Sequence, residues 1–137
     1  NTLYKLGADR VINHREQDPG KILQGEDRAN LVLELVGSTL QTSIEAAQQD
    51  GRIVLVGNLG GQEATVDTQA WRLKRVHVIG GGMLHTSIQN MEQILHLIAE
   101  KAATPLIART LPVEQAAEAH RLLASGETQG KIVLTHS

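Results

Sequence analysis

Cysteine and phenylalanine are absent from this chain of 137 residues, and Tyr4 and Trp71 are its only aromatic residues. Without cysteine, the chain itself can form no disulfide, no thiolate nucleophile and no Cys-ligated zinc or iron–sulfur site. Two aromatic rings are also too few for the stacking platforms that bind single-stranded nucleic acid. The core must therefore consist of Leu, Ile, Val and Ala, which is typical of strands packed against helices.

Charge and long apolar runs are also scarce. The formal net charge is −2 and charged residues make up 20% of the chain, so no basic surface for nucleic acid or anionic lipid is expected. No apolar run approaches the roughly 20 residues that cross a bilayer, and no stretch resembles a signal peptide. We therefore expect a cytoplasmic protein whose partners are small molecules, and neither nucleic acid nor a membrane.

Apolar runs of strand length alternate along the chain with segments of helical periodicity. In the strand predicted at residues 30–36, the run from residue 31 to 36 is apolar except for Glu34, which indicates a strand buried on both faces, as in a parallel sheet. Glycines follow most of these segments, as expected where a helix or strand ends. Strands or extended segments are predicted at residues 10–13, 30–36, 52–57, 76–79, 106–111 and 131–134, and helices at residues 2–6, 19–24, 39–49, 87–103 and 112–125.

This alternation predicts an α/β fold built on a doubly wound parallel sheet. A mixed segment of strand and helix follows, and we place the boundary between the two parts after residue 103.

Glycine ends three of the predicted strands. In open parallel sheets, ligands bind beyond the carboxyl ends of the strands, and glycine there lets a ligand approach the backbone. Glycine also simply turns the chain after a strand, and both interpretations stay open. Neither a GxGxxG fingerprint nor a P-loop is present. The three strand ends are Val36-Gly37, Val56-Gly57-Asn58 and Ile79-Gly80-Gly81-Gly82.

The six histidines do not predict a metal site. No pair has the i, i+4 spacing of an HExxH motif, and His120 falls on the apolar stripe of its helix, where a buried structural histidine is expected. No Ser–His–Asp arrangement and no pair of carboxylates has a catalytic spacing, so no catalytic residue is assigned. The other histidines are His14, His77, His85, His96 and His136.

Five segments, in order along the chain, form a recognisable set: LGADRVINHR at residues 6–15, LELVG at 33–37, GRIVLVGN at 51–58, LP with AAEAH at 111–120, and GKIVL at 130–134. Together they resemble the medium-chain dehydrogenase/reductase superfamily in its quinone-oxidoreductase-like branch. Two positions depart from the pattern of that branch, because His14 replaces a common Tyr and Glu34 replaces the usual Asp.

The resemblance implies hydride transfer between NADPH or NADH and a quinone, enone, enoyl ester, or an alcohol or aldehyde. It also implies that the chain corresponds to the C-terminal portion of such an enzyme. Residues 1–103 would be a partial dinucleotide-binding (Rossmann) domain that lacks its first strands, and residues 104–137 would return to the catalytic domain. The absence of Cys fits a zinc-independent branch, so no metal is expected in this chain.

By the same resemblance, the cofactor's adenosine end would meet His14. Its nicotinamide side would meet two loops, and Lys131 would lie near the cleft. The loop residues are Val56, Gly57 and Asn58 in the first loop, and Gly80 and Gly81 in the second. We also expect Gly57→Val to harm cofactor binding more than folding.

Three functions compete. The chain is part of an oxidoreductase, a non-catalytic α/β association module, or part of another Rossmann-type enzyme such as a methyltransferase. The closing GKIVL segment argues against the methyltransferase.

If the first strands are missing, the strand within residues 31–36 has an unpaired apolar edge, and such edges associate. We therefore expect a homo-oligomer.

Overall fold

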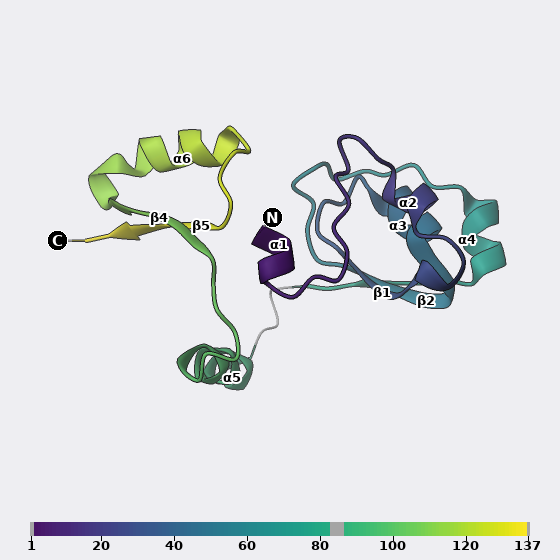
Figure 1. Cartoon of the computed structure of the whole chain (residues 1–137), viewed down its shortest axis with the longest axis horizontal. Helices are drawn as coiled ribbons and strands as arrows, with labels where there is room; N and C mark the ends of the chain where they lie inside the picture. The colour runs from purple at the N-terminus through teal and green to yellow at the C-terminus, as the bar shows by residue number, and fades with distance from the viewer. Residues whose placement is uncertain (1, 83–86, 137) are drawn as a thin grey trace. The chain divides into compact units, whose positions relative to one another are not determined.

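The computed structural model describes residues 2–82 and 87–136 (Figure 1). The chain divides into two compact units, Asn1–His85 and Thr86–Ser137, so the helix predicted at residues 87–103 belongs to the second. The boundary predicted after residue 103 concerns the domains of the complete protein and stays a prediction. None of the helices among the described residues is long and apolar enough to cross a membrane.

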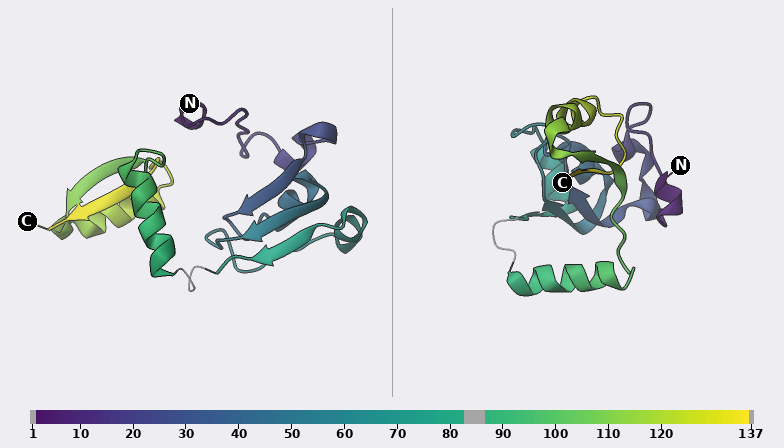
Figure 2. Two further views of the ribbon diagram at one scale, coloured as in Figure 1. Left: turned by 90° about the horizontal axis from the view of Figure 1, so that it is seen from below. Right: turned by 90° about the vertical axis from the view of Figure 1, so that its left-hand side faces the viewer.

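A parallel sheet with strand order β1-β2-β3 forms the first unit, which confirms the predicted α/β fold class. Helices α2, α3 and α4 lie over one face of this sheet (Figure 1), while the view from below in Figure 2 shows the opposite face without a helix of this unit. The strands are β1 (Ala29–Glu34), β2 (Ala47–Leu55) and β3 (His77–Gly80), and the helices are α1 (Thr2–Lys5), α2 (Pro19–Ile22), α3 (Leu40–Ala46) and α4 (Thr68–Lys74), with a 3-10 turn at Gly25–Asp27.

The core of the first unit is small and aliphatic, as the composition predicts. Ile44 of α3, Ile53 of β2 and Ala47 are fully buried, and Val76 is almost fully buried. Trp71 of α4 packs against this cluster, and its Nε1 donates a hydrogen bond to the Val76 carbonyl oxygen at 2.7 Å. The indole can therefore be partly buried without an unsatisfied donor.

Helix α4 is not predicted from the apolar pattern, which indicates a loop between β2 and β3. The sequence signal for it is Asp67, a preferred residue at helix N-termini. One carboxylate oxygen of Asp67 accepts hydrogen bonds from the backbone nitrogens of Gln69 at 2.9 Å and Ala70 at 3.1 Å. These bonds satisfy donors that have no partner inside the helix.

The helix predicted at residues 39–49 ends earlier, at Ala46. The ammonium group of Lys74 in α4 lies 2.9 Å from the carbonyl oxygen of Ile44, 2.5 Å from that of Glu45 and 2.9 Å from that of Ala47. A cation at this position satisfies the last carbonyls of a helix and is favoured by the helix dipole. Lys74 is distant in sequence from α3, so the apolar periodicity of α3 alone does not predict the residue at which this helix ends.

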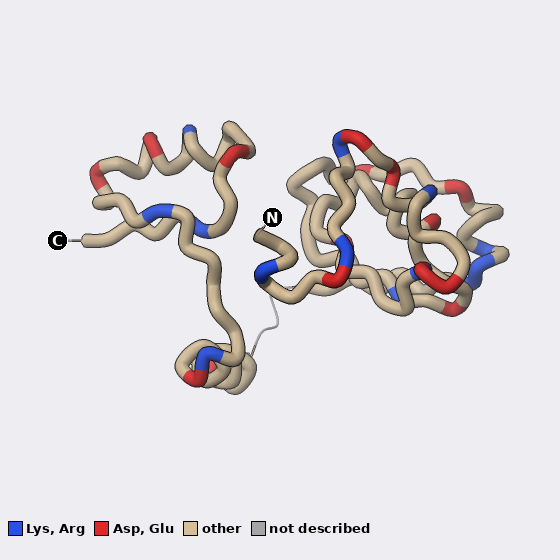
Figure 3. The backbone as a smooth tube through the Cα atoms, viewed as in Figure 1, with Lys and Arg blue, Asp and Glu red and all other residues tan. Residues whose placement is uncertain are grey.

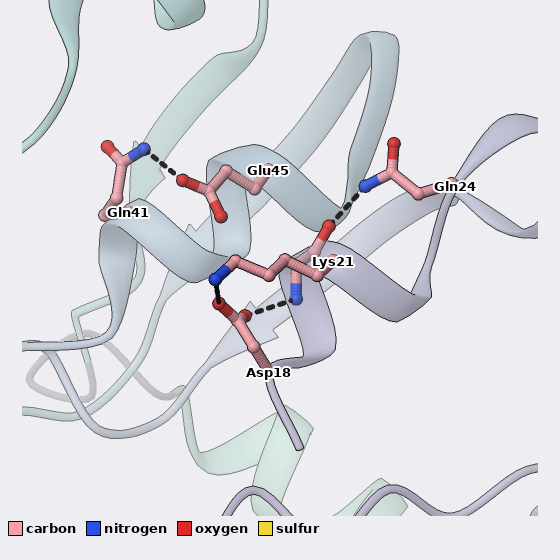
Figure 4. A network of polar contacts seen from close by, with 6 residues as sticks. Asp18, Lys21, Gln24, Gln41 and Glu45 are labelled. Atoms are coloured by element: carbon pink, nitrogen blue, oxygen red, sulfur yellow. Dashed lines mark hydrogen bonds and ion pairs between the residues drawn. The ribbon is translucent and has the colours of Figure 1, made fainter.

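Helices α2 and α3 lie side by side, and each carries polar contacts of its own (Figure 4). Asp18 caps α2 by accepting a hydrogen bond from the Gly20 nitrogen at 2.9 Å, and its carboxylate lies 3.7 Å from the Lys21 ammonium. On α3, the Gln41 amide donates to Glu45 Oε1 at 2.6 Å. A Cβ at position 20 would lie 2.8 Å from Glu45 Cβ, so glycine allows the close approach of the two helices.

Two strand predictions are wrong. Residues 10–13 form no strand, because a strand needs a neighbour to complete its backbone hydrogen bonds and the sheet ends at β1. Strand β1 is not buried on both faces, since Leu31 is 50% and Leu33 61% exposed. Alternate residues of a strand point to opposite faces, and these two lie opposite Val32, which packs against the core.

The second unit contains two parallel strands that are joined through a helix. Ala119 of that helix is buried, whereas His120 is exposed, so the predicted buried histidine is wrong. The chain begins this helix with a 3-10 turn, whose tighter winding rotates later residues relative to a continuous α-helix. The elements are α5 (Ile88–Ala99), β4 (Ile107–Pro112), the 3-10 turn (Val113–Gln115), α6 (Ala116–Ala124) and β5 (Lys131–Thr135).

Helix α5 has the predicted N-terminus, because the Ser87 hydroxyl accepts a hydrogen bond from the Asn90 nitrogen at 3.1 Å. Its apolar stripe is not buried within the described residues. Ile88 is 80% and Leu95 61% exposed. The helix therefore forms from its own capping and periodicity, while its apolar surface stays uncovered.

Candidate functional site

The loops that follow β1, β2 and β3 lie at one edge of the first unit, because the carboxyl ends of parallel strands share an edge. A cleft of about 440 Å³ opens there, and none of its lining residues carries a charge. Elsewhere, Figure 3 shows charges of both signs interspersed, in keeping with the net charge of −2. The lining residues are Gly37, Leu40, Leu55, Val56, Gly57, Asn58, Gly61, Gln62 and Ala64.

Two glycines allow the first two loops to touch. Gly37 has φ +88°, and a Cβ at this position would lie 2.6 Å from the Gly61 carbonyl oxygen. At Gly57, a Cβ would lie 2.3 Å from the carbonyl oxygen of Leu35. Since no side chain fits in these spaces, packing requires glycine at both positions. Gly57→Val would therefore also cost folding stability, and the expectation that it harms cofactor binding more than folding stays a prediction.

Glu34 joins the two loops, and the sequence reasoning missed this role. Its side chain is 3% exposed. Oε1 accepts hydrogen bonds from the backbone nitrogens of Val36 at 2.9 Å and Gly37 at 3.0 Å, and from the Thr39 hydroxyl at 2.8 Å. Oε2 accepts a hydrogen bond from the Ser43 hydroxyl. A charged residue inside an otherwise apolar strand was the available signal, because buried carboxylates almost always have partners.

Burial of the Glu34 carboxylate opposes its ionisation. The hydrogen bonds from Ser43, Thr39, Val36 and Gly37 act in the opposite direction and outweigh burial, so the pKa of Glu34 lies below its ordinary value of 4.5. The carboxylate is therefore ionised at neutral pH, and it accepts all four bonds.

The structure brings three of the seven predicted site residues together in the cleft, namely Val56, Gly57 and Asn58. Gly81 lies beside them, because its nitrogen donates to the Leu55 carbonyl oxygen at 2.7 Å. Gly80 ends β3, and a Cβ there would have no neighbour within 4 Å. Their assignment to the cofactor stays a prediction.

The other two predicted residues are not among the residues that line the cleft. His14 is exposed and borders a separate hollow of about 820 Å³ between residues 14–19, β1 and α3. Lys131 begins β5 in the second unit. Gln62 is a further cleft residue that no sequence signal indicated, since it lies in a loop without a motif.

A metal site would need several ligands at one place. Across residues 2–82 and 87–136, no three His, Asp or Glu side chains gather where they could hold a metal ion. His85 lies outside the described residues.

A family model described as zinc-binding dehydrogenase matches residues 6–134. L-threonine 3-dehydrogenase of Symbiobacterium thermophilum is 34% identical over 95% of this chain, and quinone oxidoreductase of Mus musculus is 30% identical over 93%. The solved structure of crotonyl-CoA carboxylase/reductase AntE in complex with NADP has a TM-score of 0.82 over 96% of this chain, at 25% identity. This chain spans 39%, 41% and 39% of those three chains, respectively.

Gly57→Ala should lower the free energy of unfolding by about 1–3 kcal/mol, because the added methyl group would collide with the Leu35 carbonyl. Gly80→Ala is the matched control, since nothing lies within 4 Å of its Cβ position. Urea denaturation monitored by Trp71 fluorescence measures both variants. If the two variants have the same free energy of unfolding, the loop after β1 accommodates the methyl group at position 57 without loss of stability, and the prediction is wrong.

Acid should remove the stabilisation that Glu34 provides. Because the folded-state pKa lies below 4.5, the unfolded chain takes up the proton first as the pH falls. The contribution is complete above that ordinary value and is lost as the pH falls through the folded-state pKa. Urea midpoints between pH 7 and pH 3 should therefore fall less steeply for Glu34→Gln than for the wild type. If the urea midpoints of both proteins fall equally with pH, the prediction is wrong.

Proposed function

The chain belongs to the zinc-binding dehydrogenase family, and we propose from this premise that the protein carrying it is an oxidoreductase that uses NADPH or NADH. Its substrate would be a quinone, an enone, an enoyl ester, or an alcohol or aldehyde. The names of the relatives, which include a threonine dehydrogenase and a quinone oxidoreductase, support this substrate class.

The observation that carries the proposal is the uncharged cleft at the carboxyl ends of parallel strands, where open sheets of this kind bind ligands. A reduced nicotinamide ring is neutral and bears a carboxamide. The side chains of Asn58 and Gln62 can both donate and accept hydrogen bonds to such a group. When bound, the cofactor supplies the hydride, and the residues of this chain bind and orient its ring.

The cofactor's phosphates need a different environment. Pyrophosphate binds at a helix N-terminus that follows a glycine-rich turn, and no GxGxxG sequence is present here. We therefore assign the phosphates to residues outside this chain, and the adenosine end to the exposed surface around His14. Lys131 stays a proposed cofactor-binding residue, and the resemblance alone supports it.

Zinc does not fit the described residues. The chain has no cysteine, and the described ranges hold no cluster of three potential ligands. The proposal therefore includes no step through a metal on this chain.

Asn58→Asp should weaken the binding of NADPH and NADH to the complete protein by about tenfold, because it places a negative charge in a cleft without a neutralising cation. Asn90→Asp makes the same change on the exposed surface of α5 and should leave both dissociation constants unchanged. Isothermal titration calorimetry measures both variants. Wild-type protein that binds neither dinucleotide, or equal effects of the two variants, would contradict the proposal.

A second candidate, a non-catalytic association module, is favoured by the exposed apolar edge strand β1. An unpaired strand edge is a template for pairing with another chain. We propose that the chain forms a homo-oligomer through this edge.

The 137-residue chain should therefore show a mass that rises with concentration in static light scattering. Leu33→Lys, on the uncovered face of β1, should shift the association to higher concentration, whereas Leu95→Lys on α5 is the control. A monomer at every concentration would contradict the association.

A further inference from the structure

The buried polar side chains within residues 2–82 and 87–136 are those of Glu34 and Ser43, and they bond to each other. A buried charge that serves only stability is often replaceable by apolar residues. Here the donors to Glu34 come from one place, the segment that runs from the end of β1 into α3. The carboxylate therefore fixes the conformation of a cleft loop.

The backbone of the same residue holds the second cleft loop. The Glu34 carbonyl oxygen accepts hydrogen bonds from the backbone nitrogens of Val56 at 2.8 Å and Gly57 at 3.3 Å. Further along, the Gly60 nitrogen donates to the Val36 carbonyl oxygen at 2.9 Å. Both walls of the cleft are thus tied to one residue, which itself does not line the cleft.

We propose that Glu34 is a positioning residue of the cofactor cleft: its side chain fixes the loop after β1, its backbone carbonyl holds the loop after β2, and it acts without touching the dinucleotide. This inference rests on the proposed function. Small displacements of a binding group have large effects on binding and reaction, so the length of the side chain at this position is the critical property.

The geometry distinguishes three side chains at position 34. Glutamine keeps the length, and its single oxygen can accept the three bonds that Oε1 receives, while its nitrogen can donate to the Ser43 hydroxyl. Aspartate keeps the charge but is one methylene shorter, so it cannot reach both the loop and Ser43. If Glu34 positions the loop, cofactor binding is therefore expected to be nearly unchanged in Glu34→Gln and weakened in Glu34→Asp.

Calorimetry on the complete protein with NADPH and NADH tests this. Glu34→Asp should raise the dissociation constant by about tenfold, and Glu34→Gln by less than about threefold. Lys74→Met is the control for general destabilisation, because Lys74 binds the far end of α3. It should lower the melting temperature and leave the dissociation constants unchanged. Equal weakening by Lys74→Met and Glu34→Asp, or no weakening by Glu34→Asp, would overturn the proposal.

If Glu34→Asp does not fold, Thr39→Val tests the contact from the loop side. Thr39 is exposed and donates to the same oxygen, so its loss should raise the dissociation constant by about threefold with the core intact. An unchanged value would overturn the proposal.

Amide hydrogen exchange separates this inference from the proposed function, because it needs no cofactor. In Glu34→Asp or Thr39→Val, exchange at Val36 and Gly37 should accelerate, while the Trp71 indole proton, which bonds Val76, should keep its wild-type rate. If wild-type protein binds neither dinucleotide but the loop amides respond, the proposed function fails and Glu34 still positions the loop. Unaltered exchange at the loop would overturn the role of Glu34.

Discussion

The requirement that a buried carboxylate be fully hydrogen-bonded organises the carboxyl edge of the first unit. The sheet strand β1 ends at Glu34, and the next donors along the chain turn back to the Glu34 side chain. After this turn α3 packs over the sheet, and the Ser43 hydroxyl within α3 completes the set of bonds to the carboxylate. Because the Glu34 carbonyl also binds the end of β2, the register of the two strands and the shape of the cleft have a common origin.

The glycines of the cleft follow from this constraint. Once Glu34 ties the loops together, no space remains for a Cβ at Gly37 or Gly57. At Gly37 and Gly57 the cleft wall is bare backbone, which a ligand can approach closely. The two interpretations of a glycine after a strand, a packing role and a ligand-binding role, are therefore compatible at these positions. The sequence alone could not separate them, because the contact that decides the packing role lies between residues far apart in the chain.

Local patterns predicted what depends on neighbouring residues. The apolar runs gave β1, β2, β3 and β5, and the capping residue Ser87 gave the start of α5. Features set by distant contacts were missed: the end of α3 depends on Lys74, and the role of Glu34 depends on loop donors. The cleft was predicted in part, since Val56, Gly57 and Asn58 line it. His14 was grouped with them by resemblance alone, and it borders a different hollow.

The wrong strand predictions share one physical cause. A parallel sheet is stable when both faces and both edges are covered, and the sequence of β1 has the apolar character of a covered strand. In this unit, helices cover one face, so Leu31 and Leu33 remain exposed, and residues 10–13 have no strand to pair with. Both features suit a sheet that continues past β1. The chain spans about two fifths of the relatives it matches. The apolar pattern of β1 therefore predicts a strand that is covered on both faces, whereas the described residues cover only one face.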